Sequence, residues 1–312
     1  MPLSPGSIGG SVHLRRMAPR CRRGSVSHGR EGRPEMGRVW AMLRRAGLAV
    51  VFGVLLSGVL TPAAAQMVLY EDWAAERIDP ARWRVFSLGA SASVYEVVRL
   101  ITNGQLHHAL RVYGGTRDDL GVQEGTNAVG FAQGGFTAVQ WDTTVHGYLL
   151  QGCPTPGAQP SALRVDLRMQ LFNDGSRLGP GDATGTVDTR VRLVRRTDSG
   201  DPPEVVQAIG LMTRCNVPDC GTRDVLGEVG LGPVLVGQPN TFRMVWDPLH
   251  SRVEFQKNAE PPVHLGYSVP AVTPLGGGRV WQVVAIGANC TASPRPFAEV
   301  SATLDNIFIF VP

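Results

Sequence analysis

The chain has 312 residues, of which 43% are hydrophobic and 18% charged, and it contains 38 glycines and 23 prolines. So many turn-forming residues predict short elements joined by turns and argue against long helices. The formal charge of +4 misleads, because residues 1–65 hold 10 of the 30 basic but only 2 of the 26 acidic residues. Residues 66–312 therefore carry 20 basic and 24 acidic groups, a net charge of −4 that gives no support to nucleic-acid binding.

The amino-terminal part has the three features of a secretory signal peptide. Two arginines precede an apolar run of 15 residues, Ala46–Leu60, and the small residues Ala63–Ala65 follow it. Because ~20 apolar residues are needed to span a bilayer, a signal peptide at 36–65 is favoured over a membrane anchor. We expect a secreted protein, extracellular or periplasmic, with no membrane span after cleavage. Residues 1–35 are expected to be disordered or to precede the true start codon.

The rest of the chain, 66–312, alternates between apolar and polar residues in one run after another, which is typical of β-strands with one dry face. With about a dozen such runs, no amphipathic helix and no linker, the pattern predicts a single all-β domain built as a sandwich, jelly roll or barrel. In chain order, we expect one helical turn within Asp72–Trp83 and strands at Tyr95–Ile101, Leu106–Tyr113, Gly135–Trp141, Leu163–Leu171, Thr186–Leu193, Val205–Thr213, Phe242–Trp246, Val253–Phe255, Val263–Val269, Val280–Ile286 and Glu299–Val311.

Two pairs of adjacent polar residues are interpreted as structural and not as parts of a functional site. His107 and His108 lie within one predicted strand, so their side chains point to opposite faces and cannot act together. The adjacent acids Asp118 and Asp119 are interpreted as turn residues that bond to their own backbone, in preference to calcium ligands.

Four cysteines remain in the exported part, Cys153, Cys215, Cys220 and Cys290. An even number in an exported chain favours disulfides over free thiols. A zinc site is the alternative, but the chain has no Cys-x-x-Cys pair. Four cysteines allow three pairings, of which we favour Cys215 with Cys220 and Cys153 with Cys290.

Three short motifs occur together in a way that resembles concanavalin A-like lectin/glucanase domains. They are an acidic-aromatic start with an Ile-Asp-Pro-x-x-Trp turn at 71–83, a hairpin at 241–255 and an Asp-Asn pair, Asp305-Asn306, in the last strand. The resemblance implies a two-sheet antiparallel β-sandwich of the jelly-roll type. It implies no activity, because one fold hosts many functions.

The carboxylate strand of the laminarinase-like glycoside hydrolases in this superfamily is missing. Those enzymes place carboxylates at Glu-x-Asp-x-x-Glu or Glu-x-Asp-x-Glu, so that alternate residues of one strand point into one cleft. The nearest run here is Glu71–Glu76, where Trp73 stands in the place of the middle aspartate. The sequence therefore predicts binding without cleavage.

Candidate ligand contacts come from aromatic and basic residues. Sugar rings stack on aromatic faces, and Trp141 and Tyr148 lie near predicted strand ends. Arg164 and Arg168 flank Asp166 on one face of a predicted strand, and arginine forks suit glycan hydroxyls and acidic sugars.

The resemblance also implies a structural calcium ion near the chain termini. In many domains of this kind an acidic group of the first strand and an aspartate of the last strand hold calcium where the strands meet. Glu71 and Asp305 match those places, and calcium prefers oxygen ligands.

Three functions are compatible with the sequence. We favour a secreted, non-catalytic β-sandwich that binds polysaccharide, cell-surface glycan or another extracellular ligand. The first alternative is a divergent glycoside hydrolase or polysaccharide lyase whose acid and base come from separate strands, for example Glu96 and Asp166. The second is a structural envelope protein without a ligand.

The export hypothesis predicts that the mature protein begins at Gln66, since the alanine triplet follows an apolar run too short to span a bilayer. Amino-terminal sequencing of the exported protein checks this. A product that still contains Arg44 and Arg45 would contradict it.

Overall fold

The computed structural model describes residues 66–88, 91–92, 94–124, 138–275, 279–288, 290 and 293–311. The predictions for the signal peptide and for residues 1–35 lie outside these ranges. The described chain is built of strands, with one short 3-10 turn, η1, at Pro248–His250. Its helical content includes nothing long and apolar enough to cross a membrane.

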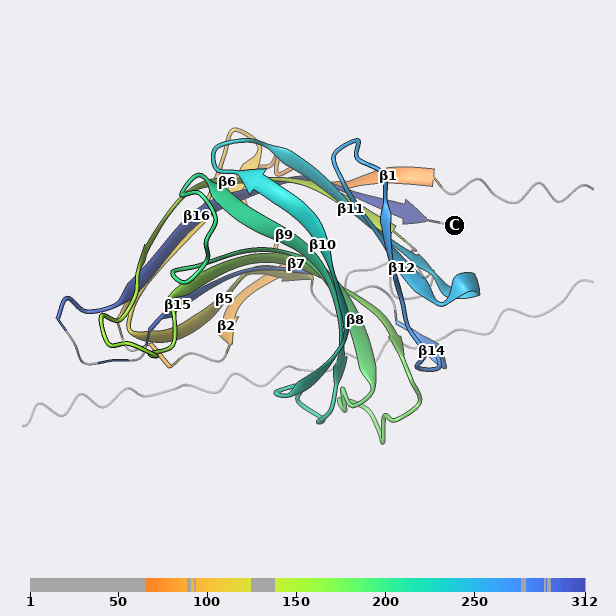
Figure 1. The fold of residues 1–312 in the computed structure, drawn as a ribbon. Helices are drawn as coiled ribbons and strands as arrows, with labels where there is room; N and C mark the ends of the chain where they lie inside the picture. Colours follow the sequence, from red (N-terminus) through yellow and green to blue (C-terminus); the bar gives the residue numbers. More distant parts are fainter. Residues whose placement is uncertain are drawn as a thin grey trace, which may run out of the picture. The chain divides into compact units, whose positions relative to one another are not determined.

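One sheet has eight strands, with β1 (Gln66–Glu71) paired to the last strand, so that the start of the described chain lies beside its end (Figure 1). The order of the other strands is β13 (Val263–Gly266), β12 (Arg252–Lys257), β11 (Asn240–Asp247), β6 (Ala138–Gln151), β16 (Phe297–Val311), β4 (Gln105–Tyr113) and β3 (Tyr95–Thr102).

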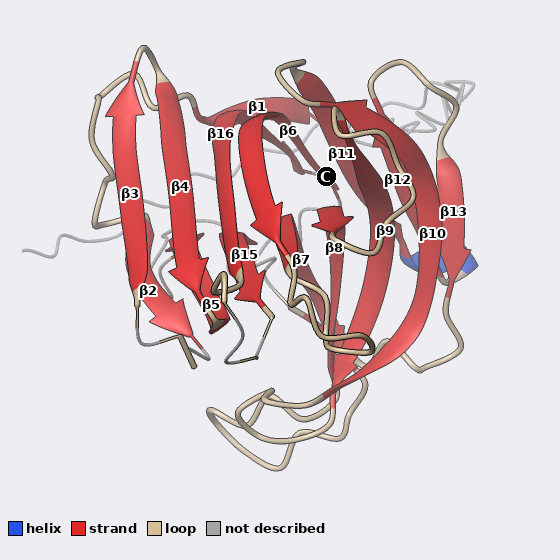
Figure 2. Cartoon of the chain, turned by 60° about the vertical axis from the view of Figure 1, so that its left-hand side comes forward, coloured by secondary structure: helices blue, strands red, loops and turns tan. Residues whose placement is uncertain are grey.

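The second sheet also has eight strands, and Figure 2 shows them forming a second layer. Neighbouring strands run antiparallel in both sheets, which confirms the predicted all-β, two-sheet sandwich. The order is β10 (Arg223–Leu235), β9 (Val205–Cys215), β8 (Thr186–Arg196), β7 (Ala162–Asn173), β15 (Arg279–Gly287), β5 (Gly115–Glu124) and β2 (Trp83–Leu88), with β14 (Thr273–Pro274) paired to β7.

The core lies between the sheets and is rich in large aromatic side chains. Trp73 and Trp83 pack with ring centroids 5.6 Å apart, and Phe172 stacks on Trp246 at the same distance. Gly210 of β9 lets the sheets approach closely, because a Cβ there would lie 2.8 Å from the Phe255 ring of β12. Large apolar side chains contribute most of the burial energy of such a core.

A buried polar cluster connects the sheets inside this core. Asp119 of β5 accepts hydrogen bonds from Arg99 Nε of β3 at 2.9 Å and from His108 Nε2 of β4 at 3.0 Å. Burial lowers the pKa of His108, although Asp119 acts in the opposite direction. Leaving a buried ion without its partner is strongly destabilising, so the cluster fixes how β3 and β4 lie over β5.

The strongly alternating segments form the strands expected of them. The hairpin is confirmed, since Trp246 of β11 pairs with Val253 of β12 across η1. The segment 72–83 contains a turn closed by Trp83 N donating to Asp79 O at 2.8 Å, as expected of one helical turn, and the turn does not continue into a helix. The alternation does not predict five strands, β1, β2, β5, β10 and β14.

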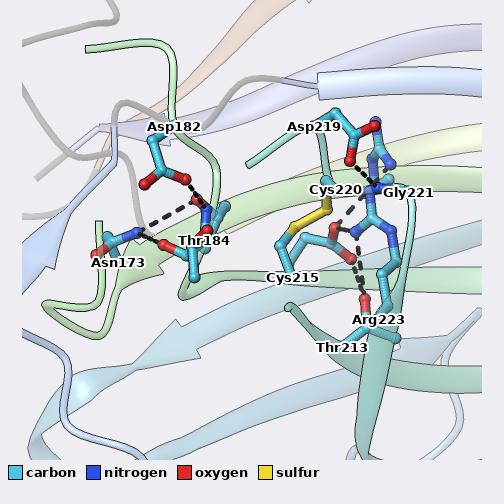
Figure 3. Close-up of a disulfide and its surroundings, with 12 residues drawn as sticks. Asn173, Asp182, Thr184, Thr213, Cys215, Asp219, Cys220, Gly221 and Arg223 are labelled. Carbon is cyan, nitrogen blue, oxygen red and sulfur yellow. Dashed lines mark hydrogen bonds and ion pairs between the residues drawn. A yellow bond between two sulfur atoms is a disulfide. The ribbon is translucent and has the colours of Figure 1, made fainter. Parts of the chain in front are cut away.

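Two disulfides join the cysteines in the pairs favoured from the sequence. Cys153 pairs with Cys290, with Cα atoms 6.2 Å apart, and this bond closes a loop of 137 residues. Cys215 pairs with Cys220 across a sequence separation of 5, at the turn between β9 and β10 (Figure 3). One crosslink is therefore long-range and the other local.

Removing the long-range disulfide should destabilise the protein more than removing the local one. The chain-entropy model gives about 5 kcal/mol for a loop of 137 residues and about 2 kcal/mol for a separation of 5. Thermal unfolding of the double variants Cys153→Ala/Cys290→Ala and Cys215→Ala/Cys220→Ala measures the difference. A larger loss of melting temperature in the second variant would contradict the expectation.

Candidate functional site

Alternation along β7 and β8 builds a row of charged side chains on the outer face of the second sheet, which points away from the core. On β7, the apolar residues belong to the core, whereas Arg164, Asp166 and Arg168 point outward. The register places Asp166 opposite Arg192 of β8 and Arg168 opposite Arg190. Directly paired residues of antiparallel strands share a face. We call this surface the charged face, made of Arg164, Asp166, Arg168, Asp188, Arg190 and Arg192.

Asp166 is fully buried and accepts hydrogen bonds on both carboxylate oxygens. Arg192 donates from Nε to Oδ1 at 2.9 Å and from Nη2 to Oδ2 at 3.2 Å. Gln282 of β15 also donates to Oδ2, at 3.0 Å. Two bonds from one guanidinium form a strong and directional ion pair, so Asp166 holds Arg192 in a fixed orientation.

Asp188 is the second buried carboxylate of the charged face. It accepts hydrogen bonds from Arg190 Nη2 at 2.7 Å, from Thr213 Oγ1 at 2.7 Å and from Arg223. Figure 3 shows Arg223 reaching toward Thr213 beside the Cys215–Cys220 disulfide. Burial would raise the pKa of Asp188, but the surrounding arginines outweigh it and lower the pKa to about 2. This carboxylate is therefore ionised throughout the physiological range.

Asp118 of β5 behaves in the opposite way. Its pairing partner Val284 of β15 lies opposite Arg164 of β7, which puts Asp118 on the same outer face. Burial, and then the charge of Asp166, raise its pKa from 3.8 to about 6, although nearby arginines act against them. Its Oδ1 has no hydrogen-bond partner in the part of the chain that the structure describes. Asp118 can therefore exchange a proton close to neutral pH.

The interpretation of Asp118 and Asp119 as turn residues is wrong. Both lie in β5, where one side chain points to the outer face and the other into the core. If the two residues had been taken as part of a strand, their adjacency would have predicted that their side chains face opposite sides. Asp119 has one partner on its own strand, Arg117 at 3.8 Å, but its hydrogen bonds from Arg99 and His108 come from other strands, so adjacency alone could not separate a turn from a strand.

The two arginines predicted as ligand contacts do share the charged face, and neither is fully matched by a carboxylate. Arg168 Nη1 lies 4.0 Å from Asp188, and burial lowers the pKa of Arg168 to about 10. Arg164 makes no side-chain hydrogen bond or ion pair with the described residues, and burial, followed by the charge of Arg192, lowers its pKa. The face therefore holds more positive charge than its own carboxylates balance.

A pocket of about 300 Å³ opens at one end of the charged face, between the segment before β7 and the strands β7, β8, β9 and β15. Three arginines, Arg164, Arg192 and Arg196, lie in its wall. The remaining wall is mostly apolar and consists of Gln159, Pro160, Ala162, Val194, Ile209 and Ile286.

The two aromatic residues predicted to bind ligand lie elsewhere. Trp141 of β6 has 1% exposure and packs on Phe242 at 5.8 Å, so its prediction as a ligand contact is wrong. The strand points it inward together with Val139 and Val145. Tyr148, partly exposed on the same strand of the first sheet, donates its hydroxyl to Pro203 O and does not join Arg164 and Arg168.

The acids predicted to bind calcium have protein partners. Glu71 accepts from Trp73 N at 3.1 Å and from Trp83 Nε1 at 2.9 Å, which fastens the turn after β1. Asp305 accepts from Gln105 Nε2 at 3.1 Å and from Asn306 N at 2.8 Å. No cluster of three or more His, Cys, Asp or Glu suited to a metal occurs among the described residues. Calcium at this place stays a prediction.

Glu96 and Asp166, given above as an example of a catalytic acid and base from separate strands, do not lie together in the structure. Glu96 lies on β3 of the first sheet, 65% exposed, and contacts Arg111 at 3.4 Å. Asp166 lies on the other sheet, on the charged face.

The expectation that His107 and His108 face opposite sides is confirmed, since His108 binds Asp119 in the core while His107 stacks on His146 at 5.8 Å.

Comparison with known proteins gives likenesses of structure only. No family model matches the sequence, and no curated protein matches it either. Among solved structures, an endo-β-galactosidase from Clostridium perfringens that releases GlcNAcα1-4Gal has 9% sequence identity and a TM-score of 0.47, and the match covers 80% of this chain and 63% of that one.

Two further solved structures are similar to the same extent. A β-glucanase from Bacillus licheniformis has 11% identity and a TM-score of 0.43, covering 80% of this chain and 98% of the other. A non-specific endo-β-1,3(4)-glucanase from family GH16 has 12% identity and a TM-score of 0.43, covering 80% and 92%. The sandwich architecture rests on the strand pairing described above, and the activities of these proteins are their own.

Replacing Asp118 by Asn should stabilise the protein at about pH 8 and change little at about pH 4. Because its pKa is raised from 3.8 to about 6, the folded state binds the proton more tightly than the unfolded chain, and stability falls as pH rises through that range. A displacement of this size corresponds to roughly 3 kcal/mol above pH 7. Thermal unfolding across this pH range measures the effect.

The matched control is Asp224→Asn, which removes a carboxylate with 60% exposure on β10. It should leave the pH dependence of the melting temperature as in the wild type. A wild-type pH dependence in Asp118→Asn would show that this carboxyl does not titrate as described.

Proposed function

We propose that the protein is exported and binds glycan on the charged face of the second sheet without cleaving it. The observation that carries the proposal is the excess of guanidinium groups over carboxylates on this face. Arginine forks donate to hydroxyl and carboxylate oxygens, which are the recognition groups of sugars. The pocket beside them offers the combination of apolar wall and a few polar groups that is typical of small-molecule sites.

The state of the carboxylates supports binding over cleavage. A glycosidase needs one carboxyl that keeps its proton and a second, ionised carboxyl at a separation of about 5 to 9.5 Å. Asp166 is held by Arg192 and Gln282, and Asp188 by Arg190, Arg223 and Thr213. Both are therefore committed to orienting arginines, which is a structural role.

One observation favours the alternative of a divergent glycan-cleaving enzyme. Asp118 holds its proton up to about pH 6, partly because the charge of Asp166 lies nearby. An acid with a raised pKa beside an ionised carboxylate is the arrangement expected of a general acid and its partner. Asp118 and Asp166 thus replace Glu96 and Asp166 as the pair to test.

A single set of assays on the exported protein separates these functions. We expect retention on at least one polysaccharide in affinity electrophoresis, together with no new reducing ends and no unsaturated products from any polymer of the panel. Product formation that disappears in Asp118→Asn would replace the proposal by the enzyme. Absence of binding to every polymer would favour a structural protein without a ligand.

A further inference from the structure

Of the three arginines in the wall of the pocket at the end of the charged face, two are paired with a carboxylate and the third is not paired with any described residue. Arg192 is occupied by its two bonds to Asp166, and Arg196 donates to Asp198 from Nε at 2.8 Å and from Nη2 at 2.7 Å. Arg164, between them in the pocket wall, has no carboxylate within ion-pair distance among the described residues. A guanidinium fork is thus available to a ligand at one place in the wall.

The charge around Arg164 adds to this. Burial and the charges of Arg192 and Arg190 lower its pKa although the charges of Asp166 and Asp118 act in the opposite direction, so the surroundings are on balance unfavourable to a further cation. An anion bound at the pocket would compensate the excess charge in a partly desolvated place, where ion pairs are stronger than in open water. A neutral ligand would leave that excess uncompensated.

The apolar part of the pocket wall, next to Arg164, is suited to the carbon face of a sugar ring. Ala162 and Ile286 belong, with Val284, to an apolar cluster on the outer side of the sheet that is separate from the core. Val194 and Ile209 extend this wall within the pocket. The volume of about 300 Å³ is at the lower end of small-molecule pockets and suits a single ring with one charged substituent.

We infer that this pocket is a subsite for a uronic acid, whose carboxylate binds the fork of Arg164 while its ring packs on the apolar wall of Ala162, Val194, Ile209 and Ile286. The inference rests on the proposed glycan binding and adds the class of sugar. A planar carboxylate accepts two parallel N–H bonds from a guanidinium, so this geometry selects a carboxyl group on the ring.

The test compares polymers that differ only at the carboxyl group. Polygalacturonate, alginate and an unsulfated glucuronate polymer are each used intact and after chemical reduction of the carboxyl to a primary alcohol. We expect at least one intact polymer to bind and its reduced form to bind about 10- to 100-fold more weakly, the loss of one charge-assisted fork. Equal binding of both forms would overturn the inference.

Substitutions place the effect at Arg164. Arg164→Gln should weaken binding of the intact polymer about 10- to 100-fold and leave binding of the reduced polymer unchanged. Arg164→Lys, which keeps the charge but loses the fork, should lie between the two. The control is Arg252→Gln, which removes the same charge from the β11–β12 hairpin, where Arg252 contacts Asp247 at 3.0 Å.

The outcomes for the inference and for the proposed function are distinct. Binding of neutral glycans with no preference for uronate would overturn the uronate subsite and leave glycan binding intact, and so would equal loss in Arg164→Gln and Arg252→Gln. Preference for a sulfated neutral polymer over every uronate would also overturn it. Failure to bind any polymer would overturn both. Melting curves of each variant ensure that a loss of binding is not a loss of fold.

Discussion

Pairing of arginine with aspartate across neighbouring strands is the interaction on which the second sheet depends. Strands β7 and β8 give their inner faces to the core, and their outer faces carry charges that are largely buried. Desolvating such ions costs several kcal/mol each unless the geometry of the pairs compensates. The strand register provides such pairs, because it sets Asp166 opposite Arg192. Asp188 likewise accepts hydrogen bonds from Arg190 and Arg223. The same pairing fixes the direction of the guanidinium groups.

Uninterrupted alternation predicted several of the longest strands correctly. The segments Leu163–Leu171 and Thr186–Leu193 and the β11–β12 hairpin alternate with a period of two, so local pattern and final structure agree there. β10 was missed because its register shifts at Gly227 and Gly232 break the period. β5 was missed because Asp118 and Asp119 are typical of turns, and most of the arginines that make them acceptable in a strand come from other strands.

The candidate site was predictable only to the extent that it depends on one strand. Arg164, Asp166 and Arg168 share a face because they alternate, and the structure keeps them together. The prediction that Trp141 contacts a ligand was wrong, because alternation shows that a strand has two faces but does not show which of them faces the core. The proximity of Asp118 to this face depends on β15 lying between β5 and β7, and that order is set by contacts among segments more than 100 residues apart.

Arg164 and Asp118, which share the outer face, have opposite chemistry. Among the described residues, Arg164 has no carboxylate at ion-pair distance and Asp118 Oδ1 has no hydrogen-bond partner, while their strands are separated only by β15. At a site of the kind inferred here, a bound carboxylate would compensate Arg164 and repel an ionised Asp118. Ligand binding would then raise the pKa of Asp118, and ionisation of Asp118 would weaken ligand binding by the same factor, because a single coupling free energy links the two events. The charge balance that stabilises the sheet would thus also set the pH range in which its pocket accepts an anion.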